Sequence, residues 1–162
     1  MLIVIDDVLD KESLDVVQGF FGSSDDARKM CWVDGNLESL LAYKSPLSQI
    51  LAKVSCSFNL SSMSGVEQWA HYGTKPNWHV DKDETLFIST GQLATPICSI
   101  VFYAEVNELT GGNFMTDTVS VTPITNRLLA FSPGMLHGVE DYTGTRMAIA
   151  VNPWVKKPGG YQ

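Results

Sequence analysis

The amino-acid sequence predicts a single, mainly β domain of the α+β class in which helices precede a β-rich body. Up to about residue 60, apolar residues recur at helical spacing between capping residues, whereas from Ser61 onward short apolar or alternating runs are separated by Gly, Pro and Asn. The 162 residues, 44% of them hydrophobic, suffice to bury one core, and no long linker divides the chain. We therefore expect one domain spanning 1–162, with a helical support segment at 1–60 and a β-sandwich or barrel at 61–155.

The N-terminal segment is predicted to contain two strands and two or three helices. Asp10 has the position of an N-cap, because Leu14 and Val17 behind it share one helical face. Ser45 followed by Pro46 has the form of an N-cap with proline at the first helical position. The predicted elements are a strand at Leu2 to Ile5, a helix from Lys11 to about Phe21, a strand at Arg28 to Val33, and helices that begin near Leu37 and at Pro46.

The β-rich body is predicted from eight short runs between turn residues. Many short strands at regular spacing are typical of a β-sandwich, a barrel or a jelly roll. The runs are Val66 to Tyr72, Thr85 to Ser89, Ile97 to Glu105, Asn113 to Met115, Ser120 to Thr122, Arg127 to Phe131, Gly138 to Glu140 and Arg146 to Pro153.

Charge and hydropathy limit the classes of partner. The net charge of -7 and the pI near 4.8, with no basic stripe, argue against a nucleic-acid binder, whose affinity rests on clustered Lys and Arg. No run approaches the ~20 apolar residues of a membrane span. The apolar stretch from Met1 to Ile5 gives way at once to Asp6, unlike a signal peptide. We therefore expect a soluble, cytoplasmic protein of bacterial or viral origin, with no membrane partner.

Three cysteines, Cys31, Cys56 and Cys98, are widely spaced, and each lies among apolar or small residues. This odd number suits buried, reduced thiols better than a disulfide framework. Because the chain contains no C-x-x-C spacing, zinc binding by these residues is the weaker interpretation.

The residues that carry chemistry are His79 and Asp81, one residue apart, and the later His137. On a strand, His79 and Asp81 leave the same face. His137 follows a Pro-Gly turn and leads into a predicted strand, which a jelly roll can bring back beside the first pair. Two histidines and one carboxylate with open coordination positions suit iron(II) used with oxygen. Taken alone, an H-x-D tripeptide is also common by chance, and a single strand histidine is more often a hydrogen-bonded residue than a ligand.

Arg146 strengthens the metal-site hypothesis, because it lies at the start of an otherwise apolar predicted strand. It either reaches solvent or points into the barrel beside the metal, where it would need an anion. A fixed guanidinium holds a carboxylate through two parallel hydrogen bonds, and the far end of 2-oxoglutarate offers such a group. Tyr103, on a neighbouring predicted strand, can donate its hydroxyl to the same carboxylate, with ordinary core packing as the alternative.

With these residues in this order, the sequence resembles the prolyl 4-hydroxylase-like branch of the iron(II) and 2-oxoglutarate-dependent oxygenases. The likeness covers roughly Val66 to Trp154, and it rests on the order and spacing of several motifs. The opening from Ile3 to Leu9 is also similar to the way such catalytic domains begin. The matching residues are His79-x-Asp81, Phe102-Tyr103, Gly111-Gly112-Asn113-Phe114, Arg127-Leu128-Leu129-Ala130-Phe131, His137-Gly138-Val139, Gly144-Thr145-Arg146 and Trp154.

The resemblance implies a double-stranded β-helix, which is a cupin-like jelly roll, supported by two or three helices. No catalytic acid or base beyond the metal centre is expected, because the metal and the co-substrate carry the chemistry. The site residues that it implies are His79, Asp81 and His137 for iron(II), Arg146 and Tyr103 for the tail carboxylate of 2-oxoglutarate, and Tyr72 and Trp154 as aromatic lining of the co-substrate pocket. Core packing is an equally open interpretation for the last two.

The implied activity is a dioxygenase reaction that hydroxylates an unactivated C–H bond, consumes O2 and 2-oxoglutarate, and releases succinate and CO2, with ascorbate as a further cofactor. The expected substrate is a prolyl or other residue in a peptide or protein loop, or a small molecule. The stretch from Thr85 to Pro96 lacks the basic residue that many relatives carry before the Tyr103 strand, so substrate contacts should differ. Residues 83–96 are either a mobile lid or a solvated connecting loop.

Two other interpretations stay open. One is a cupin-like metalloenzyme that uses the same three ligands without 2-oxoglutarate. The other is a non-catalytic jelly-roll binding module, since a fold alone does not imply a function.

Overall fold

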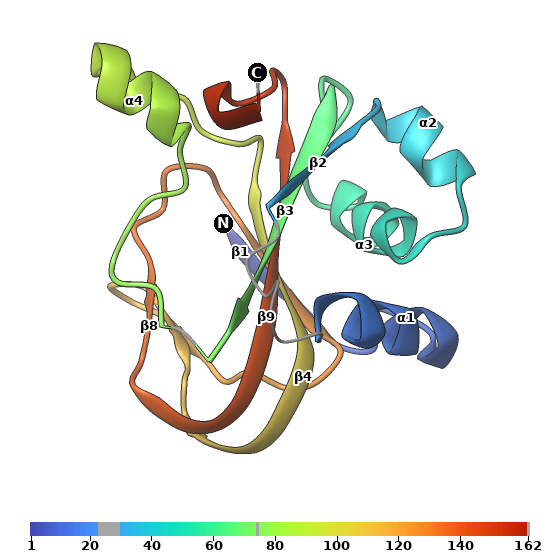
Figure 1. The fold of residues 1–162 in the computed structure, drawn as a ribbon, viewed down its shortest axis with the longest axis vertical. Coiled ribbons are helices and arrows are strands. Elements are labelled where there is room, and N and C mark those ends of the chain that lie inside the picture. The colour runs from blue at the N-terminus through green and yellow to red at the C-terminus, as the bar shows by residue number, and fades with distance from the viewer. Residues whose placement is uncertain (23–29, 74, 162) are drawn as a thin grey trace.

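The computed structural model describes residues 1–22, 30–73 and 75–161, and its β-strands form two antiparallel sheets (Figure 1). The larger sheet consists, in spatial order, of β1 (Leu2–Ile5), β7 (Arg127–Phe131), β4 (Ser99–Gly111), β9 (Tyr142–Trp154), β3 (Gly65–Tyr72) and β2 (Cys31–Asp34). The smaller sheet consists of β6 (Ser120–Val121), β5 (Phe114–Met115) and β8 (Gly138–Val139). Neighbouring strands thus come from distant parts of the chain, as in a double-stranded β-helix, and the predicted fold class is confirmed.

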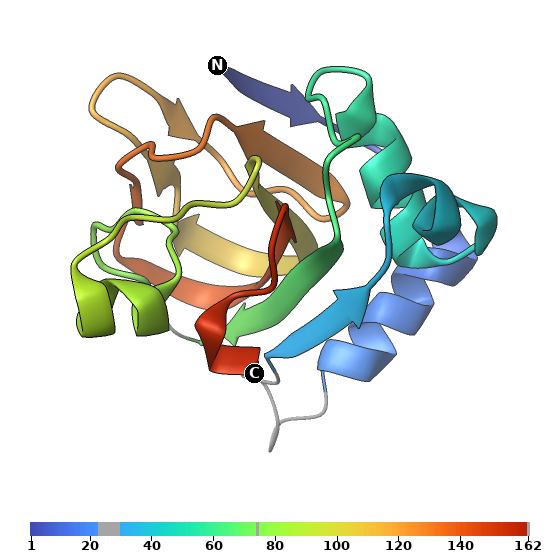
Figure 2. The same cartoon turned by 90° about the horizontal axis from the view of Figure 1, so that it is seen from above.

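Three helices cover the outer face of the larger sheet (Figure 2). They are α1 (Lys11–Phe21), α2 (Leu37–Ala42) and α3 (Pro46–Ser55). The two predicted caps, Asp10 and Ser45, each accept a hydrogen bond from the backbone N–H three residues later, at 2.8 and 3.1 Å. Such a bond satisfies one of the N–H groups that a helix leaves unpaired at its start. The predicted starts of α1 and α3 are therefore confirmed.

A first apolar core fills the space between these helices and the outer face of the larger sheet. Helix α1 contributes Val17 and Phe21 to it, and α3 contributes Ile50, Leu51 and Val54. The sheet residues packed against them are Val66, Ala70, Ile100, Phe102, Ala104, Leu128, Ala130, Met147, Ile149 and Val151.

The intervening strand residues point to the opposite, inner face, because side chains alternate along a strand. On β9, Met147 and Ile149 belong to the first core, whereas Ala148 belongs to a second core between the two sheets. Arg146 has the same parity as Ala148, so the strand directs its side chain inward. The second core consists of Tyr103, Phe114, Val121, Leu129, Phe131 and Ala148. This alternation places Arg146 and Tyr103 in the interior of the β-helix.

One predicted strand, Thr85 to Ser89, is wrong, since this stretch is the helix α4 (Glu84–Thr90). Asp83 caps it by accepting a hydrogen bond from the Leu86 N–H at 3.0 Å. Gly91 ends it with φ of 73°, the left-handed conformation that glycine adopts without strain. Periodicity alone does not separate a short apolar strand from one or two helical turns, so the capping residues decide here.

Other boundaries differ in detail. Strands β4 and β9 are longer than the predicted runs, and β2 begins at Cys31. Arg28 and Lys29 of the predicted second strand lie outside the described residues. After β9 the chain ends in a short 3-10 turn, η2 (Gly159–Tyr161). None of the described helices has the length and apolar character needed to cross a membrane.

The three thiols are free, but they differ in exposure. Cys98 is fully buried, and burial raises the pKa of its thiol to about 12. Cys31 is half-buried and Cys56 is exposed, so the predicted burial of all three cysteines is wrong for Cys56. Cys56 follows α3 directly, and the core-facing positions of that helix end at Val54.

Candidate metal centre and its two cavities

The backbones of His79 and His137 are joined by two hydrogen bonds. The His79 N–H donates to the His137 carbonyl at 2.8 Å, and the His137 N–H donates back at 3.0 Å. This antiparallel bridge fixes the two residues opposite each other, directly before β8. Their rings consequently lie close, with centroids 4.3 Å apart.

Each histidine ring is also oriented by a backbone carbonyl two residues earlier. Nδ1 of His79 lies 2.7 Å from the Asn77 oxygen, and Nδ1 of His137 lies 2.9 Å from the Met135 oxygen. A carbonyl oxygen only accepts, so Nδ1 carries a proton in both rings, and Nε2 is the atom that each ring offers to a metal once this nitrogen is unprotonated. This is the outer hydrogen bonding that metal-binding histidines need.

Asp81 completes the cluster. Its Oδ1 lies 3.4 Å from Nε2 of His79 and 4.0 Å from Nε2 of His137, and the three potential ligand atoms all lie within 4.8 Å of one another. Adjacent ligands on an octahedral ion with bonds of about 2.1 Å are about 3 Å apart. A small inward movement of these side chains would therefore let them hold a divalent ion on one face.

The charge states suit metal binding. Burial opposes ionisation of Asp81, but the hydrogen bond from His79 and the nearby His137 hold the pKa of Asp81 below its usual value. The same hydrogen bond raises the pKa of His79, whereas burial lowers the pKa of His137. The cluster thus combines an ionised carboxylate with a histidine that burial keeps neutral. Neutral nitrogen and anionic oxygen donors are the set that iron(II) accepts.

A small space, here called the inner cavity, lies behind the three residues. Its free volume is about 30 Å³, enough for about two water molecules. Arg146 and the metal-cluster side chains line it together with aromatic and apolar groups. The lining residues are Trp69, His71, Pro76, His79, Asp81, Val101, Phe114, His137, Val139, Arg146, Ala148 and Ala150.

Arg146 and Tyr103 are buried with unsatisfied polar atoms. They are only 2% and 0% exposed, and the guanidinium carbon lies 5.0 Å from the tyrosine ring centroid. Nε and Nη1 of Arg146 and the hydroxyl of Tyr103 have no hydrogen-bond partner among the described residues. Burial raises the pKa of Tyr103 despite the opposing charge of Arg146, so the hydroxyl stays protonated. A buried cation and a buried donor without an acceptor are costly, which indicates that the space beside Arg146 is built for an anion.

The structure does not bring Tyr72 and Trp154 to the inner cavity. Strand alternation puts Tyr72 on the face opposite His71, and it is 40% exposed. Trp154 is on the inner face but at the far end of β9, and its Nε1 donates to Oε2 of Glu67 at 3.0 Å. The aromatic lining comes from other residues.

Those residues are Trp69 and Phe114, which sequence reasoning missed. Phe114 stacks on the ring of His137 with centroids 5.4 Å apart. Nε1 of Trp69 donates to Nε2 of His71 at 2.9 Å, and this pair lines both the inner cavity and a larger neighbour. The sequence could have placed Trp69 on the cavity side, because Trp69 and His71 alternate along β3 with the core residues Val66 and Ala70 and so point to the opposite face.

The larger neighbour, here called the outer groove, has a volume of about 650 Å³. It shares Trp69, His71, His79 and Asp81 with the inner cavity, so the two spaces meet at the metal cluster. Its further walls include Glu67 and Asn152 on neighbouring strands, the segment 82–85, and Pro158, Gly160 and Tyr161 at the C-terminal end.

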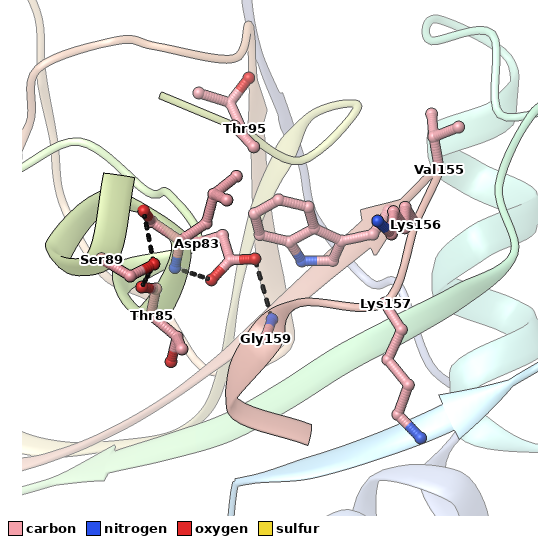
Figure 3. A pocket seen from close by; sticks show the side chains of 11 residues that line it. Asp83, Thr85, Ser89, Thr95, Val155, Lys156, Lys157 and Gly159 are labelled. Atoms are coloured by element: carbon pink, nitrogen blue, oxygen red, sulfur yellow. Dashed lines mark hydrogen bonds between the residues drawn. The ribbon is translucent and has the colours of Figure 1, made fainter. Parts of the chain in front are cut away.

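A third cavity, of about 400 Å³, lies between α4 and the chain that follows β9 (Figure 3). Beside it, the carboxylate of Asp83 accepts hydrogen bonds from the N–H groups of Leu86 and Gly159, at 3.0 and 2.8 Å. The stretch predicted as a lid or a loop is therefore a capped helix followed by a loop, and Asp83 ties its start to the C-terminal turn that walls the outer groove.

No family model matches the sequence, and no curated protein matches it either. Solved structures, however, share the fold. The viral collagen prolyl hydroxylase of Paramecium bursaria Chlorella virus-1, in its 2-oxoglutarate complex, superposes with a TM-score of 0.64 over 96% of each chain at 15% identity. A prolyl 4-hydroxylase of Pseudomonas putida gives 0.62 over 96% of this chain and 88% of that one, at 14% identity.

A third similar structure is the prolyl hydroxylase of Trichoplax adhaerens in complex with a peptide fragment of hypoxia inducible factor. It gives a TM-score of 0.57 over 99% of this chain and 86% of that one, at 17% identity. These likenesses agree with the double-stranded β-helix derived from the strand order above.

Proposed function

We propose that this protein is an iron(II)- and 2-oxoglutarate-dependent dioxygenase that hydroxylates an unactivated C–H bond, with O2 as co-substrate and succinate and CO2 as co-products. The whole chain would act as one oxygenase domain. The substrate that we propose is a prolyl or other residue in a peptide or protein. The fold shared with prolyl hydroxylases, one of them bound to a peptide, supports this class. Ascorbate as a further cofactor and a cytoplasmic location stay predictions from the sequence.

The observation that carries the proposal is the pairing of two features in one cavity. The metal cluster and Arg146, whose Nε and Nη1 have no acceptor among the described residues, line the same inner cavity. A metal site alone would suit many reactions. A metal site that shares a cavity with a buried guanidinium, itself packed against the ring of Tyr103, suits a dianion that chelates the metal at one end and presents a carboxylate at the other.

His79, Asp81 and His137 would hold the iron, and Arg146 with Tyr103 would hold the tail carboxylate of 2-oxoglutarate. Bound iron and 2-oxoglutarate would supply the oxidising chemistry. The protein side chains bind and orient: the carbonyls of Asn77 and Met135 fix the two imidazoles, and the packed rings around His137 exclude water. Tyr72 and Trp154 are left out of the proposed set, because Tyr72 lies on the opposite face of β3 and the indole of Trp154 donates to Glu67, whereas Tyr103 packs against Arg146.

Binding of the co-substrate requires side chains to move. A five-carbon diacid exceeds the free volume of about 30 Å³. Trp69 and His71 are only partly buried and stand between the inner cavity and the outer groove. We propose that this hydrogen-bonded pair shifts toward the outer groove when 2-oxoglutarate binds.

The test is aerobic conversion of 2-oxoglutarate to succinate with added iron(II), followed by NMR in the presence of proline-containing peptides. Arg146→Gln should raise the KM for 2-oxoglutarate about 10- to 100-fold, since charged hydrogen bonds contribute about 1.5–3 kcal/mol. Arg127→Gln is the matched control, because Arg127 pairs with Asp6 on the outside. Absence of succinate with every substrate tried, or an unchanged KM in Arg146→Gln, would contradict the proposal. A metal-dependent activity that needs no 2-oxoglutarate and survives Arg146→Gln would favour a cupin-like enzyme.

A further inference from the structure

We propose that the outer groove binds a positively charged side chain of the substrate, lysine or arginine in a peptide, through the carboxylate of Glu67. This inference rests on the proposed function and narrows its substrate class. It assigns a role to two buried polar residues, Glu67 and Asn152, that the metal centre does not use.

Glu67 is a buried acid without a cation. It points inward from β3, is 7% exposed, and accepts a hydrogen bond from the neutral indole of Trp154. The Tyr161 hydroxyl, which is also neutral, lies close enough to lower the pKa of Glu67. No lysine or arginine of the described residues lies within ion-pair distance of it. Burial raises the pKa of Glu67, and the negative charges of Asp81 and Asp83 raise it further. A ligand cation beside this carboxylate would offset its cost of burial.

Asn152 supplies a second, independent sign of a ligand. It is 1% exposed, and on β9 it is the direct cross-strand neighbour of Glu67. Its Oδ1 accepts a hydrogen bond from the Ile100 N–H at 3.2 Å, which fixes the orientation of the amide. Nδ2 therefore faces away from this bond, lacks a partner, and belongs to a residue that lines the groove. A buried N–H donor of this kind calls for an acceptor such as a peptide carbonyl.

The other charges around the groove are already paired. Lys82 donates to Glu84 at 2.7 Å and lies 5.1 Å from the ring centroid of Phe87, so the cation at the rim is neutralised. Asp83 is occupied by two backbone N–H groups, and Asp81 belongs to the metal cluster. Glu67 is thus the acid left for a ligand. The net charge of -7 would also attract basic peptides over long range.

The outer groove adjoins the metal cluster, which determines how far the charged residue of the substrate lies from the residue that is hydroxylated. Because the groove and the inner cavity share His79 and Asp81, a side chain held at Glu67 presents a neighbouring residue of the same peptide to the metal. The expected substrate is a peptide in which the hydroxylated residue is flanked by lysine or arginine. An inorganic cation would leave the Asn152 donor unpaired, so a group that also carries a carbonyl fits better.

The experiment compares two fluorescent, proline-containing peptide pools that differ only in having lysine or norleucine at the positions flanking proline. Binding to the iron(II)-loaded protein with 2-oxoglutarate is measured anaerobically by fluorescence anisotropy. The lysine pool should bind at least 10-fold more tightly, and Glu67→Gln should remove this preference. Glu12→Gln is the control, since it removes the same charge from the exposed first turn of α1 and should leave the preference unchanged.

Equal affinity for the two pools, or a preference that survives Glu67→Gln, would overturn the inference. Should Glu67→Gln fail to fold, a carbodiimide cross-link in the unaltered protein gives a second measurement: the lysine peptide should be joined to Glu67 in the mass spectrum, and a cross-link only to exposed acids would count against the inference. Binding is measured without turnover, so a failure to form succinate refutes the proposed function separately from the groove.

Discussion

Trp154 donates its indole N–H to the carboxylate of Glu67, with a distance of 3.0 Å between Nε1 and Oε2. Both residues are more than nine-tenths buried, at 3% and 7% exposure. The bond connects the end of β9 to β3 beside the outer groove. This hydrogen bond holds the Trp154 side chain away from the inner cavity, although the sequence resemblance implies a place for Trp154 in the co-substrate pocket.

Trp154→Phe should therefore reduce stability and leave co-substrate binding unchanged. The substitution removes the indole N–H that donates to Oε2 of Glu67. The loss of this buried hydrogen bond should lower the free energy of unfolding by about 1–3 kcal/mol. Urea unfolding measures this loss, and the KM for 2-oxoglutarate measures the other expectation. A KM raised 10-fold at unchanged stability would instead return Trp154 to the co-substrate pocket.

Substitution of single histidines should distinguish the residues that bind the metal from residues that only lie near it. His137→Ala should weaken binding of a divalent ion more than about 100-fold, because it deletes one of three ligands, and loss of even an outer partner costs 10- to 100-fold. Calorimetry with iron(II) under anaerobic conditions, or with zinc, measures the affinity. His71→Gln is the matched control among the three histidines of the chain, since His71 lines the cavity but is not part of the cluster. Equal losses in both variants would contradict the assignment.

Tyr103→Phe should weaken co-substrate binding without harming the fold. The hydroxyl has no partner among the described residues, so its removal relieves a buried, unsatisfied group and should leave the free energy of unfolding unchanged or raise it by about 1 kcal/mol. The same hydroxyl would donate to the tail carboxylate, so the KM for 2-oxoglutarate should rise about 5- to 10-fold. A marked loss of stability would indicate that the hydroxyl already has a structural partner.

Much of the fold could be predicted from the sequence because local signals and tertiary structure agree. Asp10 and Ser45 predict the starts of two helices, because their side chains satisfy N–H groups of the first turn. The alternation of side chains along β9 puts Arg146 and Met147 on opposite faces of the sheet. The error at Thr85 to Ser89 has a local cause. Its apolar run is too short for periodicity to decide, while Asp83 and Gly91 carried the helical signal at its two ends.

The candidate site was predictable only in part. His79, Asp81 and His137 were found from their residue types, order and spacing, and Arg146 was found because it precedes an apolar strand. The cavity walls depend on which strands lie opposite one another, which one sequence does not specify. Trp154 illustrates this limit: it has the parity of Arg146 on β9 but is eight residues further on, about 26 Å along a strand that rises about 3.3 Å per residue.

The ion pair between Asp6 and Arg127 should make stability depend on pH at the acid side. Arg127 donates from Nε and Nη2 to the two carboxylate oxygens of Asp6, at 2.6 and 2.9 Å, and so joins the end of β1 to the start of β7. This hydrogen bonding lowers the pKa of Asp6 below 3.8. For an acid whose pKa is lowered by folding, the stabilisation is complete above the pKa of the unfolded chain and is lost as the pH falls through that of the folded chain.

Asp6→Asn should accordingly lower the Tm at pH 6 to 7, by a small amount because the pair is exposed to solvent. The difference from the unaltered protein should shrink as the pH falls below 3.8 and should vanish only below the lowered pKa that Asp6 has in the folded protein. Thermal unfolding of both proteins between pH 7 and about pH 2 measures the difference, so that other carboxylates, which titrate equally in both, cancel. In an Arg127→Gln background the same substitution should have no pH-dependent effect. A difference in Tm that stays constant over the whole range, or that persists without Arg127, would mean that the Asp6 side chain contributes through packing and not through its charge.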